Sequence, residues 1–166
     1  IIERMHSELP FRKILLTFFS PSGYELRKHY AMVDKVVYLP FATRRNAKRM
    51  VGMLPLEAAV MAKYEFWPAY LNALKAKQVP TYLVSAIFRP KQLFFRPWGQ
   101  GYRQLLHVFD CIFVQDAASA ELLRKYAVDR VEVAGDTRFD RVIEVRNQAK
   151  ELSVVEQFLG DAARVI

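Results

Sequence analysis

Short apolar runs alternate with longer mixed segments along the whole chain. The runs predict strands at residues 13–19, 34–39, 56–63, 79–86, 110–115 and 131–134. The segments between most of them carry helix formers and capping residues, which predicts helices at 1–9, 24–30, 44–53, 68–77, 117–126, 139–150 and 154–159. Parallel strands need a crossover of about a dozen residues or more, usually a helix. The alternation therefore predicts an α/β fold with a doubly wound parallel sheet and helices on both faces.

The first predicted strand is apolar throughout, so we expect it to be buried on both faces. It runs into the turn Ser20-Pro21-Ser22-Gly23, which begins the next helix. Either Ser20 caps this helix, with Pro21 in the first helical position, or Ser22 caps it together with Glu25 in a capping box. Both versions place backbone N–H groups and hydroxyls where an anion or a sugar hydroxyl can bind, but the same residues also suit a simple capped turn.

Uncommon residues follow several of the predicted strands. In parallel sheets ligands bind beyond the carboxyl ends of the strands, so one rim of the sheet should collect these residues. They are Ser20, Ser22 and Gly23, then Glu65 and Trp67, Ser85 and Arg89, Gln115 and Asp116, and Asp136 and Arg138.

The run Tyr64-Glu65-Phe66-Trp67-Pro68 is the most distinctive of these. A carboxylate between an apolar strand and a helix that starts at Pro68 is expected to be poorly solvated, and it then needs a partner. Glu65 could orient a hydroxyl or a cationic group, or form a purely structural pair with an arginine. Trp67 is expected to pack, with a sugar platform as the other interpretation.

The segment 88–103 interleaves cations with large aromatic side chains. Nucleic-acid bases could stack on such rings, and the same mixture suits a lipid–water interface. A third interpretation is a long loop that packs on the core and keeps its charges in water.

Composition, net charge and the motifs that are missing limit the kinds of function that the chain can have. The chain has 166 residues, 52% of them hydrophobic, and a net charge of +8, which suits one domain with partners that carry negative charge. The single cysteine, Cys111, excludes an internal disulfide and lies in an apolar run. No metal-ligand spacing, dinucleotide fingerprint, P-loop or long apolar run is present.

Six motifs occur in order: residues 15–25 (Leu-Leu-Thr-Phe-Phe-Ser-Pro-Ser-Gly-Tyr-Glu), 37–40, 65–68, 85–89, 113–116 and 134–140. Together they resemble the N-terminal domain of 3-deoxy-D-manno-octulosonic acid (Kdo) transferases, the lipid A glycosyltransferases, over nearly the whole chain. The resemblance implies the Rossmann-like N-terminal half of a GT-B fold. It also implies transfer of Kdo from CMP-Kdo to a bisphosphorylated lipid A precursor at the cytoplasmic face of the bacterial inner membrane, without a metal or other cofactor.

The resemblance also assigns roles to residues. Glu65 would be a supporting acidic residue of catalysis, because the family's general-base glutamate belongs to a loop expected upstream of Ile1, together with a first strand. Substrate contacts would come from Ser20, Ser22, Gly23, Trp67, Arg89 and Arg138. A membrane or acceptor surface would contain Lys91, Phe94, Phe95, Arg96, Trp98 and Arg103.

The chain is thus expected to be an excised part of a longer enzyme and inactive alone. Residues 1–160 would form the acceptor-side domain, and residues 161–166 a linker or the start of the donor domain, which would bind CMP-Kdo. The lipid A precursor and the anionic inner-membrane surface would be its partners, with no specific nucleic acid. The alternatives are a basic α/β binding module without catalysis, for nucleic acid or an anionic surface, and a different GT-B glycosyltransferase.

Overall fold

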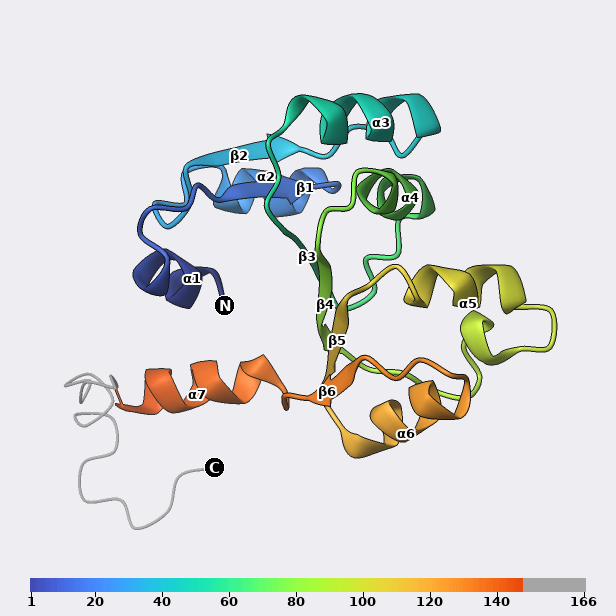
Figure 1. Cartoon of the computed structure of the whole chain (residues 1–166). Helices are drawn as coiled ribbons and strands as arrows, with labels where there is room; N and C mark the ends of the chain where they lie inside the picture. The colour runs from blue at the N-terminus through green and yellow to red at the C-terminus, as the bar shows by residue number, and fades with distance from the viewer. Residues whose placement is uncertain (148–166) are drawn as a thin grey trace, which may run out of the picture. The chain divides into compact units, whose positions relative to one another are not determined.

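The computed structural model describes residues 1–147, and helices and parallel strands alternate along them (Figure 1). One compact unit is Ile1–Gly135, and a second begins at Asp136. The helices of the first unit are α1 Ile2–Glu8, α2 Pro21–Arg27, α3 Arg44–Met53, α4 Pro68–Ala76, the 3-10 helix η1 Leu93–Phe95, α5 Gln100–Leu106 and α6 Ala117–Lys125. The second unit contributes α7 Thr137–Asn147.

All strand pairs are parallel, which confirms the α/β, Rossmann-like class. The strands are β1 Leu15–Phe18, β2 Lys35–Tyr38, β3 Ala59–Ala62, β4 Thr81–Ala86, β5 Cys111–Val114 and β6 Val131–Val133. They differ from the predicted arrangement in one respect, because they form two sheets. β1 pairs with β2, and β3, β4, β5 and β6 form a separate sheet in that order.

The largest hydrophobic core lies on the four-stranded sheet. Leu83 of β4 and Ile112 and Val114 of β5 are fully buried, as expected for strands with a neighbour on each side. Residues of η1, α5 and α6 complete this core. The burial of β5 is thus the burial that its continuous apolar sequence predicts.

A second core joins α3 to α4, which lie next to each other (Figure 1). Two polar side chains add hydrogen bonds to it. The Tyr70 hydroxyl donates to the carbonyl of Pro40 at 2.7 Å, and the Lys77 ammonium donates to the carbonyls of Val51 and Leu54 at 2.8 and 2.6 Å. These contacts tie the segment after β2 to the helix that follows β3.

The burial predicted for the first strand is wrong. Each of the four residues of β1 is only half-buried, although all four had been expected in the core. The physical reason is that β1 has a hydrogen-bonded neighbour on one edge only, namely β2. Its other edge faces a groove.

Element boundaries differ modestly from the predictions. α2 begins at Pro21, earlier than expected, and β3 is shorter than the predicted strand, since residues 56–58 and Lys63 lie outside it. The segment expected to be a long loop contains η1 and α5. The helix predicted at 154–159 lies outside the described residues.

Candidate active site

The carboxyl ends of β1 and β3 meet at one place. The rings of Phe19, just after β1, and Trp67, at the start of α4, have centroids 4.8 Å apart. Ser20, Glu65 and Trp67 line the same groove, whose volume is about 530 Å³. Two of the predicted groups of rim residues are therefore brought together. Sequence analysis missed Phe19, whose signal was a large aromatic residue placed directly after a strand.

Ser20, and not Ser22, caps α2. The Ser20 Oγ accepts from the Gly23 N–H at 3.3 Å, and Pro21 occupies the first turn. Glu25 does not close a capping box. Its carboxylate instead accepts from the Lys28 ammonium at 2.6 Å, and this hydrogen bond raises the pKa of Lys28. The Ser20 hydroxyl oxygen thus already accepts a hydrogen bond within the turn.

Gly23 has a packing role in this turn. A Cβ added there would lie 2.7 Å from Cδ1 of Phe18 and 3.2 Å from the Ser20 Oγ. The missing side chain allows the first turn of α2 to approach the end of β1 closely. Gly23 therefore helps to place Ser20 at the groove.

Glu65 is exposed, contrary to the expectation that it is poorly solvated. The reason is that β3 ends at Ala62 and a tight turn follows, in which Lys63 has φ 56° and the Glu65 N–H donates to the Ala62 carbonyl. The Glu65 carboxylate accepts a hydrogen bond from the indole N–H of Trp67. In the described part of the chain no arginine or lysine forms an ion pair with it. Glu65 is therefore oriented by a neutral donor, and the residue is exposed to solvent.

Trp67 thus has two roles in the structure. It packs on the second core and against Phe19, which agrees with the expectation of a packing residue, and it orients Glu65. Its assignment as a substrate contact stays a prediction.

The residues at the carboxyl ends of β4 and β5 make mostly structural contacts. Ser85 is 7% exposed with φ 55°, and its carbonyl accepts from the Gln115 amide at 2.9 Å. Asp116 caps α6 by accepting from the Ser119 N–H at 2.6 Å. Arg89 is exposed, and its backbone N–H donates to the Gln92 side chain.

The prediction that Phe94 and Phe95 belong to a membrane or acceptor surface is wrong. Phe94 and Phe95 are only 8% and 6% exposed, because η1 turns both rings into the main core. The side chain of Arg103 also makes contacts within the fold. Its Nε donates to the Phe94 carbonyl at 2.9 Å, and its guanidinium lies 4.4 Å from the ring centroid of Tyr126. The third interpretation of segment 88–103, a loop packed on the core, describes Phe94 and Phe95, whereas Arg103 is half-buried and its assignment to the surface stays a prediction.

Other residues of that segment are exposed, although Phe88 and Gly99 are buried like Phe94 and Phe95. Lys91, Arg96 and Trp98 face solvent, and Trp98 is 73% exposed. The Arg96 Nε donates to the Lys91 carbonyl at 3.2 Å, which holds the two basic residues near each other. We refer to Arg89, Lys91, Arg96 and Trp98 as the basic–tryptophan surface.

Arg138 lies in the second unit. Its Nε donates to the Asp136 carboxylate at 2.8 Å, and its backbone N–H donates to the same carboxylate at 3.0 Å. Asp136 thus holds Arg138 at the start of α7. Its predicted role as a substrate contact stays a prediction.

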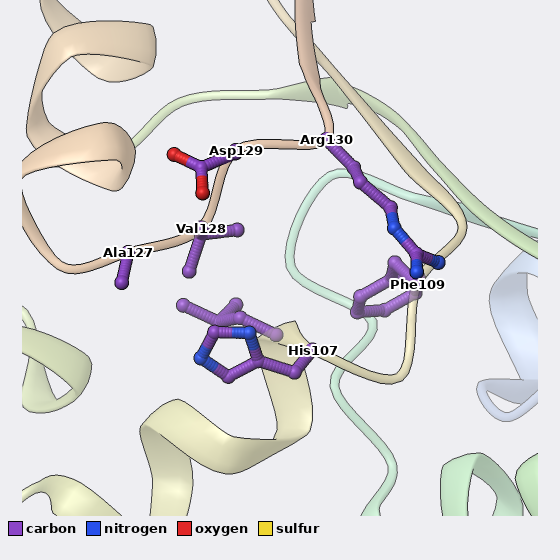
Figure 2. A pocket seen from close by; sticks show the side chains of 7 residues that line it. His107, Phe109, Ala127, Val128, Asp129 and Arg130 are labelled. Carbon is purple, nitrogen blue, oxygen red and sulfur yellow. The ribbon is translucent and has the colours of Figure 1, made fainter.

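A smaller pocket of about 240 Å³ lies at the amino ends of β5 and β6 (Figure 2). It is lined by Leu106, His107, Phe109, Ala127, Val128, Asp129 and Arg130. The fold places ligands at the opposite, carboxyl ends of parallel strands. This pocket is therefore separate from the candidate site.

Within residues 1–147, the side chains that the structure describes include no three histidine, cysteine or carboxylate groups that come together as a metal site. None of the helices in the same range has the length and apolarity needed to cross a membrane.

Comparison with known proteins identifies the family. Residues 1–141 match the family model described as 3-deoxy-D-manno-octulosonic-acid transferase (kdotransferase). A curated 3-deoxy-D-manno-octulosonic acid transferase of Bordetella pertussis is 28% identical over 104 residues, which cover 62% of this chain and 24% of that protein. The chain matches about a quarter of the length of this relative. Since the family model covers most of the chain, the chain belongs to the Kdo transferase family, as its N-terminal domain.

Proposed function

We propose that the chain is the acceptor-side domain of a GT-B glycosyltransferase that moves Kdo from CMP-Kdo to a lipid A precursor in lipopolysaccharide biosynthesis. The family match over residues 1–141 supports this proposal most strongly. The domain that binds CMP-Kdo would lie in the part of the enzyme beyond these residues. The placement of Glu65 and Ser20 on one groove at the carboxyl ends of the strands fits an active site there.

The reaction needs a base and an oriented acceptor. A carboxylate, expected in a loop before Ile1, takes the proton of the acceptor hydroxyl while its oxygen attacks the anomeric carbon of Kdo. The bond between that carbon and the phosphate oxygen breaks, and CMP leaves with the electron pair. Glu65 would accept a hydrogen bond from a substrate hydroxyl, since Trp67 fixes the orientation of its carboxylate. No metal takes part in this scheme.

The basic–tryptophan surface would meet the anionic cytoplasmic face of the inner membrane. Basic side chains are attracted to anionic headgroups, and tryptophan favours the boundary between headgroups and acyl chains. The side chains of Lys91, Arg96 and Trp98 are exposed, and they supply both the positive charges and the indole ring. This arrangement would bring a bisphosphorylated lipid to the domain.

The test of the reaction is turnover by the full-length enzyme. With CMP-Kdo and bisphosphorylated lipid A precursor, we expect CMP release and a Kdo-modified lipid, with activity retained in EDTA. Residues 1–166 alone should give no product. Transfer from a different sugar nucleotide, with none from CMP-Kdo, would identify another GT-B glycosyltransferase and overturn the proposal.

The surface is tested by binding to vesicles that contain anionic lipid, over a salt series. The double variant Lys91→Glu/Arg96→Glu should bind several-fold more weakly, whereas Lys48→Glu/Arg49→Glu on α3 makes the same change of charge elsewhere and should bind nearly as well as the parent. Equal losses in the two variants would mean that net charge alone drives binding. Equal affinity for single-stranded DNA, with a steep dependence on salt, would favour the nucleic-acid alternative.

A further inference from the structure

Left-handed backbone at residues other than glycine marks a few positions of the chain. Among the residues that the structure describes, Lys63, Gln78, Ser85 and Ala127 have positive φ values, of 56°, 57°, 55° and 60°. Most side chains cost free energy in this conformation, because the Cβ atom comes too close to the backbone. Gln78 and Ala127 directly follow the C-caps of α4 and α6, where a left-handed residue commonly ends a helix. Lys63 and Ser85 lie at the ends of strands instead.

Lys63 and Ser85 lie at the carboxyl ends of β3 and β4, which are neighbours in one sheet (Figure 1). Ala62 is the Cα partner of Val84, and each of the two left-handed residues directly follows a member of this pair. The Lys63 N–H donates to the Val84 carbonyl at 2.8 Å. Both positions are therefore at the end of the strands where parallel sheets bind ligands.

The conformation of Ser85 has a structural reason. The register between β4 and β5 shifts between Leu83 and Ala86, so Ser85 belongs to an irregular part of the strand. The Gln115 amide donates to the Ser85 carbonyl at 2.9 Å and fixes this part. One type of β-bulge contains a left-handed residue. Of the four residues, Lys63 is the one that neither a helix end nor a bulge explains.

Lys63 occupies a turn position that suits other residue types. The Glu65 N–H donates to the Ala62 carbonyl at 3.2 Å, which makes Lys63 the second residue of a tight turn. Glycine, asparagine and aspartate are favoured at turn positions with positive φ, because they tolerate this conformation at low cost. Lysine at this position therefore lowers the stability of the turn. A residue that costs stability at a ligand-binding edge is a candidate for function.

The charge of Lys63 does not compensate for this cost within the fold. The residue is exposed, and its ammonium belongs to none of the ion pairs among the described side chains. Glu65 lies only two residues on, but its carboxylate accepts from the indole N–H of Trp67. One turn thus carries an oriented carboxylate and an ammonium that is paired with no carboxylate of the described chain.

We propose that Lys63 binds a negatively charged oxygen of a substrate, from a carboxylate or a phosphate group, beside the Glu65 carboxylate. An ammonium is a compact charge with three donors on a flexible four-carbon stem, which suits such oxygens. The hydrogen bonds to the Val84 and Ala62 carbonyls fix the turn, so the stem starts from a defined place. Glu65 would accept from a substrate hydroxyl while Lys63 neutralises substrate charge.

This inference rests on the proposed function, in which both substrates are anionic. CMP-Kdo carries a phosphate and the carboxylate of Kdo, and the lipid A precursor carries two phosphates. Each substrate thus offers the oxygen chemistry that an ammonium binds. Kinetic measurements distinguish the two sources.

Steady-state kinetics of the full-length enzyme test the proposal. Lys63→Asn removes the charge, and asparagine tolerates positive φ, so the turn should keep its conformation. We expect the KM for one anionic substrate to rise by about 10- to 100-fold, because a hydrogen bond between charged groups is lost. Lys63→Arg should restore part of the affinity. Lys13→Asn is the matched control, since Lys13 is an exposed lysine just before β1, at the amino ends of the strands, and it should leave both KM values unchanged.

The two sources of the anion give different results, and each would support the proposal. A higher KM for CMP-Kdo alone would identify an oxygen of the donor. A higher KM for the bisphosphorylated acceptor, with a smaller change for an acceptor that lacks one phosphate, would identify a phosphate of the acceptor.

Urea unfolding measures the cost of the turn separately. Lys63→Gly should unfold at a higher urea concentration than the parent protein and should lose as much affinity as Lys63→Asn. A lower unfolding midpoint for Lys63→Gly would show that the lysine side chain stabilises the turn, and it would overturn the proposal. Unchanged KM values in Lys63→Asn, or an equal rise in Lys13→Asn, would also overturn it.

Failure of the proposed function would give a different result from failure of this inference. If the parent enzyme uses another sugar nucleotide and not CMP-Kdo, the proposed function is wrong. That donor is also anionic, so the ratio of KM values between Lys63→Asn and the parent enzyme still decides whether Lys63 binds the charge.

Discussion

The indole N–H of Trp67 donates a hydrogen bond to the carboxylate of Glu65, two residues earlier in the chain. The same indole ring packs against Phe19, which follows β1. The orientation of the Glu65 carboxylate is thereby tied to the packing between the ends of β1 and β3. A change in this ring therefore affects both the orientation of Glu65 and the packing, and the two effects can be separated.

Trp67→Phe should keep most of the packing and remove the donor. We expect kcat/KM of the full-length transferase to fall by about 10- to 150-fold, because a hydrogen bond to a charged group contributes about 1.5–3 kcal/mol. Glu65→Gln should lower it by at least as much. Steady-state kinetics and urea unfolding on the same samples measure the two effects.

Tyr64→Phe is the matched control, since Tyr64 is an exposed neighbour that also carries a polar group on an aromatic ring. It should leave both activity and stability unchanged. If Trp67→Phe retained full activity while Glu65→Gln lost it, the indole would not be what orients the carboxylate.

The amino-acid pattern predicts the alternation of strands and helices well, because burial and capping act locally. β5 and α6 follow from an apolar run and an Asp cap at Asp116. The pairing of strands depends on partners distant in sequence, so the division into two sheets could not be predicted from the apolar run of β1.

The aromatic residues of segment 88–103 show the same limit. Their composition suits a surface or a core equally. Only the turn of η1, which packs Phe94 against Phe66 and Phe88, decides which side of the segment is buried. The hydrogen bond between Glu65 and Trp67 could not be predicted from the sequence either, since it depends on the turn after β3.

The cap of α2 gives a second prediction. Ser20→Ala should lower the free energy of unfolding by about 1 kcal/mol, because the Gly23 N–H loses its acceptor. Ser22→Ala, two residues on, should cost only a few tenths of a kcal/mol, since its hydroxyl makes one long contact of 3.4 Å to the Ser20 Oγ. Urea unfolding of the two variants compares them directly. A larger loss for Ser22→Ala would favour the capping box with Glu25.

Cys111 should react slowly with iodoacetamide. Burial, followed by the negative charge of Glu132, raises the pKa of its thiol. The thiolate is the reactive form, so a raised pKa lowers its fraction at any pH below that pKa. At pH 7.5 we expect alkylation several-fold slower than for free cysteine, with the rate still rising above pH 9. Glu132→Gln should speed the reaction at pH 7.5, and a rate equal to that of free cysteine would contradict the prediction.

Gly99 and Gly101 should respond to alanine with opposite signs. A Cβ on Gly99 would overlap the Leu93 carbonyl oxygen and lie 3.2 Å from that of Arg96, and these backbone atoms cannot move without opening the turn after η1. Gly99→Ala should therefore cost about 2–3 kcal/mol. Gly101 lies in α5 with nothing within 4 Å of its Cβ position, so Gly101→Ala should add about 0.5–1 kcal/mol of helix stability.

This pair of variants tests the burial of Phe94 and Phe95, because the same turn carries both rings into the core. Urea unfolding gives the two free energies, and hydrogen exchange locates the change. Gly99→Ala should speed exchange in η1 and α5 while α3 keeps its rates. If Gly99→Ala were as stable as Gly101→Ala, the turn would be open, and the aromatic rings of this segment would be available at the surface after all.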